Sequence, residues 1–289
     1  MSVDGELKTL KALKPEPVLS PSLIEYQTRG DPAHQAVVLV HGMHSSLETF
    51  LNTADDLAAE GFFVVLFSQR GHGTTPDVGW DYSLTLLAQD LCALLDHLGL
   101  TQKVVVLGHS FGAKTALRFA ALCPSRVSKV VIEDMDMKLR HNHDLEEEAR
   151  TVRNAEREKA MTPLLFDSIE HVQEHEGRVR EDKLIKTPEG KLQLKYRPYV
   201  VSLYGYYCTV EDQTGDLKVL SRHQIPLLVI GAGLDETAIS PGGREHFERH
   251  CKLLTYVVVH EAGHTVHRTK RRIFNIHLLK FLRQTASNI

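Results

Sequence analysis

Short, continuous runs of apolar and often β-branched residues recur along the chain. Runs without alternating polar positions are typical of strands in a parallel sheet that is buried on both faces. The predicted strands cover residues 36–40, 62–67, 104–107, 130–132, 226–230 and 254–259. A further strand is predicted before them, within residues 23–30.

Helical patterns lie between most of these runs. The predicted helices cover residues 51–60, 83–98, 111–122, 244–250 and 271–284. In the last of them, Ile273, Ile276, Leu279 and Leu282 recur at helical spacing, which predicts that they form the buried face. Strands that alternate with helices imply right-handed crossovers, so the pattern predicts an α/β fold with a doubly wound, mostly parallel sheet.

One region breaks this alternation. Roughly 90 residues separate the strand at 130–132 from the strand at 226–230, far more than a crossover needs. The segment opens with a charged amphipathic helix over 144–161, in which Asp144 and Glu147 form a capping-box pattern. We expect residues 1–136 and 223–289 to form the core, and residues 137–222 to form a largely helical lid over the carboxyl edge of the sheet, where ligands bind in open α/β folds. The apolar wall residues expected in this lid are Leu164, Leu165, Phe166 and Tyr204.

Composition narrows the class of protein. The 289 residues carry a net charge of −3, which gives no reason to expect nucleic acid or an anionic membrane as a partner. No apolar run reaches the roughly 20 residues that span a bilayer, and the N-terminal stretch lacks an apolar signal-peptide core, so we expect a cytoplasmic protein without stable membrane insertion. Four cysteines without CxxC spacing predict free thiols. The sequence does not define the oligomeric state.

The junction between the strand at 104–107 and the following helix contains the strongest chemical signal. Gly108, His109, Ser110, Phe111 and Gly112 form a G-x-S-x-G sequence between a strand and a helix. This is the context of a nucleophile elbow, in which a strained turn exposes the serine hydroxyl at a helix N-terminus. We therefore predict that Ser110 is a nucleophile.

A nucleophilic serine needs a general base, and a histidine loop near the C-terminus supplies candidates. His264 follows the last predicted strand, and Gly263 before it allows the loop to turn the imidazole back over the sheet. His260 and His267 are close rivals. We predict that His264 is the base.

The base in turn needs an acid that orients it. Asp235, in the loop "GAGLDE" after the strand at 226–230, is the predicted acid, since the order serine, acid, histidine is the one expected of this architecture. The run "VVIEDMDM" offers an alternative in Glu133, Asp134 and Asp136, because the end of that earlier strand also faces the site. We predict Asp235, because the two glycines before it give the backbone the freedom to turn the carboxylate toward His264.

Acyl transfer also requires two N–H donors for the developing oxyanion. The residue after the nucleophile, Phe111, supplies one such amide. The loop after the strand at 36–40 supplies the other, and Met43 is the best-placed residue in it.

Together these motifs resemble those of the α/β-hydrolase fold superfamily over nearly the whole chain. The resemblance rests on "LVHGM", the "RGHG" turn at 70–73, the elbow "GHSFG", the acid loop "GAGLDE" and the histidine loop "EAGH". Within the superfamily the chain is most similar to small abhydrolase-type carboxylesterases, although Ser68 and Ala113 stand where those enzymes usually carry Asp and Gly. The resemblance implies neither a metal ion nor an organic cofactor.

The expected function is hydrolysis of small acyl esters or thioesters. The only partner that we expect is a small-molecule acyl substrate. Two alternatives stay open. One is an enzyme that cleaves a carbon–carbon or other specialised bond with the same triad, and the other is a ligand-binding receptor with slow turnover. Sequence does not define the natural substrate or its acyl length.

Overall fold

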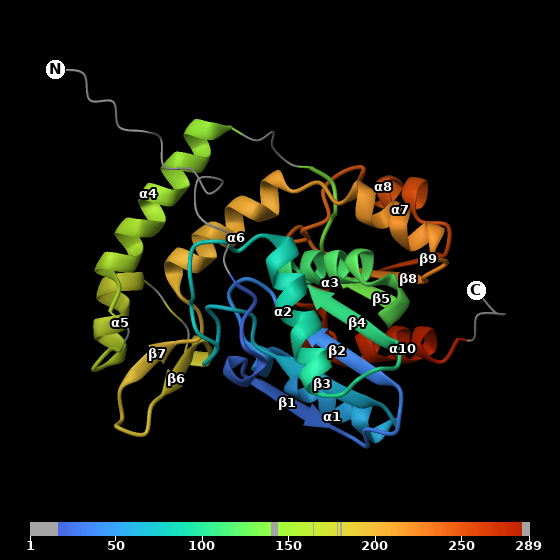
Figure 1. Cartoon of the computed structure of the whole chain (residues 1–289), viewed down its shortest axis with the longest axis horizontal. Helices are drawn as coiled ribbons and strands as arrows, with labels where there is room; N and C mark the ends of the chain where they lie inside the picture. Colours follow the sequence, from blue (N-terminus) through green and yellow to red (C-terminus); the bar gives the residue numbers. More distant parts are fainter. Residues whose placement is uncertain (1–16, 140–143, 164, 178, 180, 285–289) are drawn as a thin grey trace.

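A seven-stranded sheet forms the centre of the molecule in the computed structural model, which describes residues 17–139, 144–163, 165–177, 179 and 181–284 (Figure 1). The strand order is β1-β3-β2-β4-β5-β8-β9. β1 pairs antiparallel with β3, and every other pair is parallel. The strands are β1 (Tyr26–Arg29), β2 (Ala36–Val40), β3 (Phe63–Phe67), β4 (Val104–His109), β5 (Val127–Glu133), β8 (Leu227–Ala232) and β9 (Leu254–Val259).

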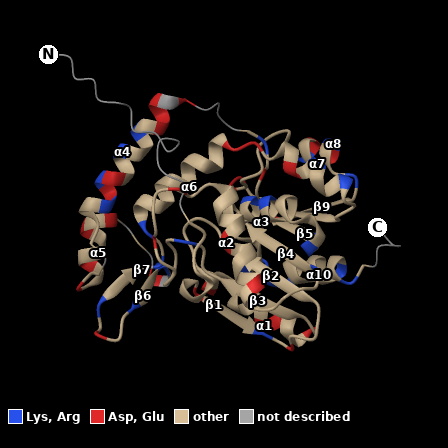
Figure 2. Cartoon of the chain, in the orientation of Figure 1, with Lys and Arg blue, Asp and Glu red and all other residues tan. Residues whose placement is uncertain are grey.

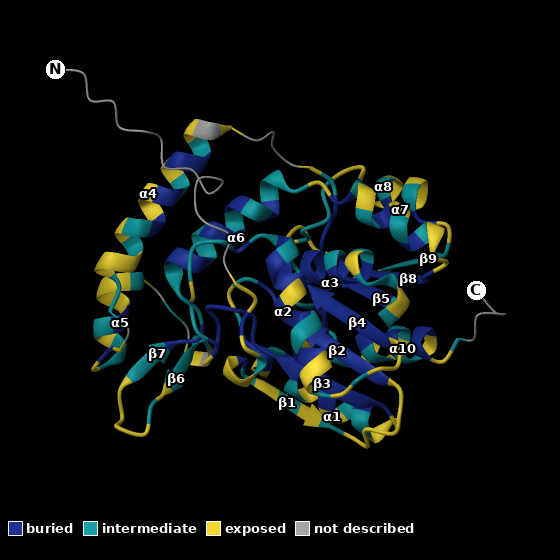
Figure 3. Cartoon of the chain, in the orientation of Figure 1, coloured by how far each residue is buried: buried dark blue, intermediate teal, exposed yellow. Residues whose placement is uncertain are grey.

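Helices cover both faces of the sheet, as the alternating pattern predicts. On one face lie α1 (Leu51–Ala59) and α10 (Arg271–Leu282), and on the other lie α2 (Leu84–His97), α3 (Phe111–Leu122), α7 (Thr214–Arg222) and α8 (Gly243–His250). Each face has its own cluster of buried apolar residues. Figure 3 shows the central strands buried throughout, because the apolar runs are covered on both sides. The predicted fold class is therefore confirmed.

The C-terminal helix corrects one detail of the sequence analysis. Its buried residues are Phe274, Leu278, Phe281 and Leu282. Ile273 and Ile276 are instead 42% and 55% exposed. The helix carries two apolar stripes, and the stripe with the larger aromatic side chains faces the sheet because it buries more apolar area.

The segment between β5 and β8 lies at the carboxyl edge of the sheet. Its elements are α4 (Leu145–Met161), α5 (Ile169–Glu176), a hairpin of β6 (Leu184–Lys186) and β7 (Leu192–Leu194), α6 (Pro198–Val210) and α7. Asp144 caps α4 by accepting a hydrogen bond from the amide of Glu146, and charged residues follow this helix along its length (Figure 2). The last helix of the segment, α7, packs against α3 and α8.

Hydrogen bonds join this segment to loops that follow the early strands. The amide of Arg197 donates to the carbonyl of Gly71 (3.1 Å), and the amide of Gly73 donates to the carbonyl of Lys195 (2.7 Å). Both glycines lie in the loop after β3, at the carboxyl edge. These hydrogen bonds attach the insertion to the carboxyl edge of the sheet. Within the described residues, no helix is both long enough and apolar enough to cross a bilayer.

Candidate active site

Ser110 occupies a strained turn between β4 and α3. Its φ of 53° and ψ of −127° lie outside the regions that L-residues ordinarily adopt. The amide of Ser110 donates to the carbonyl of Glu133 on the neighbouring strand (2.9 Å), and its carbonyl accepts from the amide of Ala113 (2.9 Å). The surrounding backbone therefore holds a conformation that would be unfavourable in isolation.

Two glycines make this junction possible. A Cβ on Gly108 would lie 2.2 Å from the carbonyl oxygen of Gly112, and a Cβ on Gly112 would lie 2.3 Å from the carbonyl oxygens of Val40 and His41. Both distances are far inside van der Waals contact. Only glycine at these two positions lets α3 start so close to β4 and β2.

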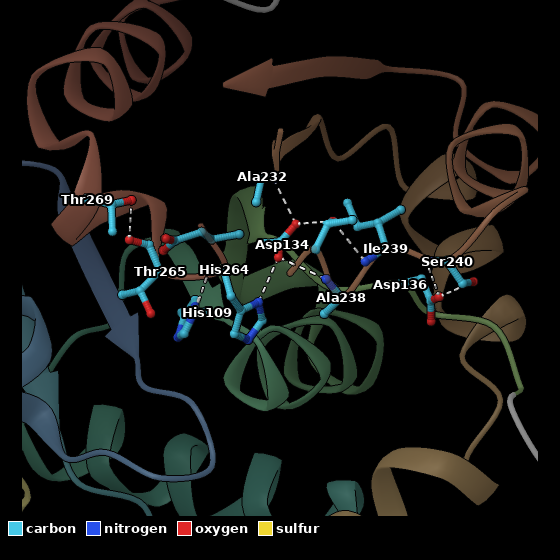
Figure 4. A network of polar contacts seen from close by, with 12 residues as sticks. His109, Asp134, Asp136, Ala232, Ala238, Ile239, Ser240, His264, Thr265 and Thr269 are labelled. Atoms are coloured by element: carbon cyan, nitrogen blue, oxygen red, sulfur yellow. Dashed lines mark hydrogen bonds and ion pairs between the residues drawn. The ribbon is translucent and has the colours of Figure 1, made fainter. Parts of the chain in front are cut away.

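His264 lies in the loop between β9 and the short helix α9 (Val266–Thr269), and its ring faces Asp134 (Figure 4). Its Nδ1 is 2.7 Å from Oδ2 of Asp134. The histidine side chain is 31% exposed, whereas the aspartate side chain is fully buried. A histidine whose Nδ1 is held by a carboxylate keeps Nε2 as the nitrogen that can accept a proton.

Asp134 is bound by four groups. Besides His264, it accepts hydrogen bonds from the amide of Ala232 (2.8 Å), the hydroxyl of Thr237 (2.7 Å) and the amide of Ala238 (3.0 Å). Burial alone raises the pKa of this carboxyl, but the hydrogen bonds outweigh burial and hold its pKa below the ordinary value. Asp134 is therefore ionised at neutral pH.

The structure contradicts the choice of Asp235 as the partner of the histidine. Asp235 is exposed, and within the described part of the chain His264 makes its carboxylate contact with Asp134. The "GAGLDE" loop takes part in a different way, because Ala232, Thr237 and Ala238 donate hydrogen bonds to Asp134. The physical reason is how the loop after β8 packs: its backbone amides surround the carboxylate of Asp134, and its own Asp235 side chain is left exposed to solvent.

A second histidine–carboxylate pair lies beside the first. Both carboxylate oxygens of Glu133 are within 2.9 Å of Nδ1 of His267, and the amide of His267 also donates to this carboxylate. Nε2 of His267 contacts the hydroxyl of Thr49 (3.0 Å), and its ring stacks on Phe50. Burial raises the pKa of Glu133, but His267 and His109 outweigh it and lower the pKa overall. Sequence reasoning named both residues as rivals but did not predict that they pair.

His109 lies between the two pairs. Its ring centroid is 4.7 Å from that of His264 and 5.3 Å from that of His267. Its Nε2 is 3.1 Å from the carbonyl oxygen of His264 (Figure 4). Burial lowers the pKa of His109 to about 4, so the ring is neutral and donates this hydrogen bond. His109, the residue before the serine in the elbow motif, thus holds the backbone of the histidine loop.

The loop after β2 presents the amide of Met43. The amide of Gln69 donates to Nε2 of His41, so Nδ1 of this ring carries the proton and donates to the carbonyl of Gly42 (2.8 Å). Burial lowers the pKa of His41 well below its ordinary value, in keeping with a neutral ring. The peptide bond between Gly42 and Met43 is trans, so the N–H of Met43 points opposite to the carbonyl of Gly42. Because that carbonyl faces the ring of His41, the N–H of Met43 points away from His41. Phe111 is the first residue of α3, where an amide has no acceptor within the helix.

A cavity of about 140 Å³ brings these groups together. Ser110, His264 and Met43 all line it, although they come from three loops that are far apart in sequence. The other lining residues are Gly42, His44, Ser45, Thr49, His109, Lys183, Thr265 and Arg268.

Of the expected wall residues of the lid, the three that the structure describes do not line the Ser110 cavity, and the expectation is corrected for them. Leu164 lies outside the described residues. Leu165 is 46% exposed, and Phe166 lines a separate cavity. Tyr204 is fully buried, stacks on Phe111 with 4.3 Å between ring centroids and donates to the carbonyl of Arg70. Helical and apolar patterns identify buried side chains but not which cavity they face. The residue that the insertion does contribute to the site is Lys183, which sequence reasoning missed.

The described residues of the site do not form a set of metal ligands. Among the residues that the structure describes, no group of three His, Cys, Asp or Glu side chains could hold a metal ion. The histidines of the site are bound to carboxylates, a hydroxyl and backbone carbonyls instead.

The chain belongs to the α/β hydrolase fold family, whose model matches residues 35–270. A Bacillus subtilis protein named "Putative 2-succinyl-6-hydroxy-2,4-cyclohexadiene-1-carboxylate synthase" is 28% identical over 269 residues, which cover 88% of this chain and 92% of that protein. A Haemophilus influenzae "Putative esterase/lipase" is 30% identical over 124 residues, which are 41% of each chain. The mouse "sn-1-specific diacylglycerol lipase ABHD11" is 36% identical over 124 residues, 43% of this chain and 38% of the lipase. The chain thus spans less than half of each of these last two relatives.

Solved structures show the same fold. A marine microorganism esterase superposes with a TM-score of 0.70 at 21% identity, covering 89% of this chain and 98% of the esterase. A thermophilic esterase from Thermogutta terrifontis gives a TM-score of 0.67 at 24% identity, with 90% and 93% covered. At these identities the likeness establishes the architecture and not the substrate.

Proposed function

We propose that the protein is a serine hydrolase that cleaves small acyl esters or thioesters, with Ser110 as nucleophile, His264 as general base and Asp134 as the acid. The observation that carries the proposal is the cavity into which the elbow serine and the Asp134-bound histidine both open. Family membership and the esterase relatives support the same class of reaction.

In this mechanism Oγ of Ser110 attacks the acyl carbonyl while Nε2 of His264 takes its proton. Ionised Asp134 stabilises the imidazolium that forms, and its other hydrogen bonds keep it a weak base that leaves the proton on the histidine. The amides of Met43 and Phe111 stabilise the oxyanion. His264 then gives the proton to the departing alkoxide or thiolate. A water, deprotonated by His264, hydrolyses the acyl-enzyme and regenerates Ser110.

A second candidate is a reaction at a bond other than an ester, carried out by the same three residues. The Bacillus subtilis relative supports this candidate, because it is named as a synthase and the match covers most of both chains. The cytoplasmic location and the lid role of residues 137–222 stay predictions.

The test combines covalent labelling with kinetics. A fluorophosphonate probe should label Ser110, as located by peptide mass spectrometry, and p-nitrophenyl esters should be hydrolysed. Ser110→Ala should abolish labelling and lower kcat by several orders of magnitude, while Ser22→Ala, at an exposed serine, should change neither. Labelling at another residue, or more than about a tenth of the activity left in Ser110→Ala, would exclude this mechanism.

A further inference from the structure

The turn "RGHG" at residues 70–73 is a sequence motif that the proposed mechanism does not use. It follows β3 at the carboxyl edge of the sheet, and its third residue, His72, is fully buried. The imidazole lies between the rings of His41 and Tyr204, whose centroids are 5.0 and 4.9 Å away. Buried polar groups are ordinarily hydrogen-bonded, so the partners of this imidazole indicate what it does.

One partner of His72 belongs to the loop that follows β2. Nε2 of His72 lies 2.6 Å from the carbonyl oxygen of Met43, and Nδ1 lies 3.2 Å from the carbonyl oxygen of Arg70. Burial lowers the pKa of His72 to about 4, so the ring is neutral at pH 7 and carries one proton. A carbonyl oxygen can only accept, so the nitrogen with the shorter contact carries the proton. His72 therefore donates a hydrogen bond to the carbonyl of Met43.

Both peptide groups that flank the Cα of Met43 are thus held by imidazole donors. Nδ1 of His41 donates to the carbonyl of Gly42, which fixes the peptide plane that contains the amide of Met43. Nε2 of His72 donates to the carbonyl of Met43, which fixes the next plane. Because only φ and ψ are soft between two peptide planes, holding both planes leaves the amide of Met43 little freedom to rotate.

The turn that carries His72 is itself anchored on two sides. Arg70 makes two hydrogen bonds to the buried carboxylate of Asp90, from Nε to Oδ2 (2.6 Å) and from Nη2 to Oδ1 (2.8 Å). On the other side, backbone hydrogen bonds join the turn to residues 195–197 of the insertion. The imidazole therefore has a rigid support, which a group needs if it is to hold another in a precise position.

We infer that His72 is a positioning residue of the oxyanion hole, which holds the carbonyl of Met43 and thereby keeps the amide of Met43 in place at the Ser110 cavity. The inference rests on the proposed function, because it requires an oxyanion to form beside Ser110. The described residues that line this cavity include Met43 but not His72, so His72 acts through Met43. A donor that is fixed before the reaction needs no reorganisation in the transition state.

The kinetic test compares substitutions that remove the donor with one that keeps it. His72→Leu and His72→Phe have no N–H, and the phenyl ring preserves the packing between His41 and Tyr204. His72→Gln keeps an amide N–H that can reach the same carbonyl. Both donor-free variants should lower kcat for p-nitrophenyl acetate by about 10- to 100-fold and change KM less than about threefold, because a displaced oxyanion donor weakens binding of the transition state rather than of the substrate. His72→Gln should restore kcat to within about threefold of the wild type.

An alkyl trifluoromethyl ketone reports on the oxyanion hole more directly. Oγ of Ser110 adds to its carbonyl carbon, the hydroxyl proton passes to His264, and the carbonyl oxygen becomes an oxyanion in the hole. The inhibition constant of this ketone should rise in the donor-free variants by about the factor by which kcat/KM falls. A purely structural role of His72 would lower the melting temperature without this proportionality.

The matched control is Tyr204→Phe. It removes the hydrogen bond that Tyr204 donates to the carbonyl of Arg70 in the same turn (3.2 Å), and it does not alter the contact between His72 and Met43. This variant should keep kcat within about twofold of the wild type. Circular dichroism and thermal unfolding should establish which variants are folded, and the second donor-free variant is used if the first does not fold.

Three results would overturn the inference. They are a folded donor-free variant with kcat within about threefold of the wild type, a loss of kcat/KM that the affinity for the ketone does not follow, and an equal loss in Tyr204→Phe. The wild type should still hydrolyse the ester and be labelled at Ser110 by a fluorophosphonate in each of these cases. If the wild type does neither, the proposed function itself fails, so the two failures are distinguishable.

Discussion

Each of the two histidine–carboxylate pairs at the carboxyl edge joins a carboxylate at the end of β5 to a histidine in the segment after β9, yet their surroundings differ. Glu133 and Asp134 are consecutive at the end of β5, and His264 and His267 are three residues apart after β9. In the Glu133–His267 pair the carboxylate is fully buried and the imidazole is 1% exposed. In the Asp134–His264 pair the carboxylate is fully buried and the imidazole is 31% exposed.

Strand geometry explains the difference. Successive side chains of a strand point to opposite faces, so Glu133 and Asp134 diverge. Glu133 meets His267 on the face of α10, where the imidazole packs between Phe50 and Phe274. Asp134, with a φ of 47°, leaves the strand and turns to the loop after β8.

The difference separates an anchoring pair from a reactive one. Both ring nitrogens of His267 contact protein groups, Glu133 and Thr49. His264 binds Asp134 through Nδ1 and opens into the Ser110 cavity. We therefore expect changes to the Asp134–His264 pair to lower activity and changes to the Glu133–His267 pair to lower stability.

The largest expected effect is on catalysis by the Asp134–His264 pair. Asp134→Asn should lower kcat by about 10⁴-fold, because the imidazole loses its preferred tautomer and the stabilisation of its charged form. Asp235→Asn should change kcat less than about twofold, since that side chain is exposed. Steady-state kinetics on a p-nitrophenyl ester measures both. The reverse ranking would return the acid to the loop after β8.

The next largest effect is on the stability provided by the buried pair. Glu133→Ala leaves His267 buried without its carboxylate and should lower the free energy of unfolding by about 3–5 kcal/mol. Urea denaturation followed by circular dichroism gives the value. Glu60→Ala, which removes an exposed ion pair with Arg283, should cost less than about 1 kcal/mol. Equal losses in the two variants would contradict an anchoring role.

The histidine between the pairs should produce a dependence of stability on pH. His109 has a folded pKa of about 4, below the ordinary value of 6.5, so between these values the unfolded chain binds a proton that the folded chain does not. Stability therefore rises with pH in this window, by about 1.4 kcal/mol per pH unit where the difference is complete. The lowered pKa values of His41 and His72 act in the same direction.

His109→Asn should consequently have a shallower slope than the wild type when the free energy of unfolding is measured from pH 7 to pH 5. The slope is the readout, because the substitution also removes the contact with the carbonyl of His264. Parallel curves for the two proteins would show that His109 is protonated alike in the folded and unfolded states.

The smallest effect concerns the second nitrogen of the anchoring histidine. Thr49→Val keeps the side-chain shape but removes the hydroxyl that contacts Nε2 of His267, and it should lower the free energy of unfolding by about 1 kcal/mol. Differential scanning calorimetry resolves a change of this size. If stability is unaltered, the buried pair does not depend on this contact.

The sequence by itself determined the parts of the fold that local physics controls. Apolar runs specify the central strands, because a strand buried on both faces needs an apolar residue at every position. The elbow motif predicts a tight strand–helix junction because only glycine avoids the clashes found at Gly108 and Gly112. Ser110 and His264 were placed at one edge because both follow predicted parallel strands, whose carboxyl ends share that edge.

Only the tertiary structure decided how these local parts meet. Asp134 rather than Asp235 faces His264 because the loop after β8 packs its amides around the Asp134 carboxylate and leaves Asp235 exposed, and such contacts between distant loops are not encoded locally in either loop. Lys183 reaches the site although it lies some 70 residues from the elbow, because the insertion folds back over the loop after β2. Hydrophobic and polar periodicity indicates which side chains are buried, but packing between distant segments determines which groups share a cavity.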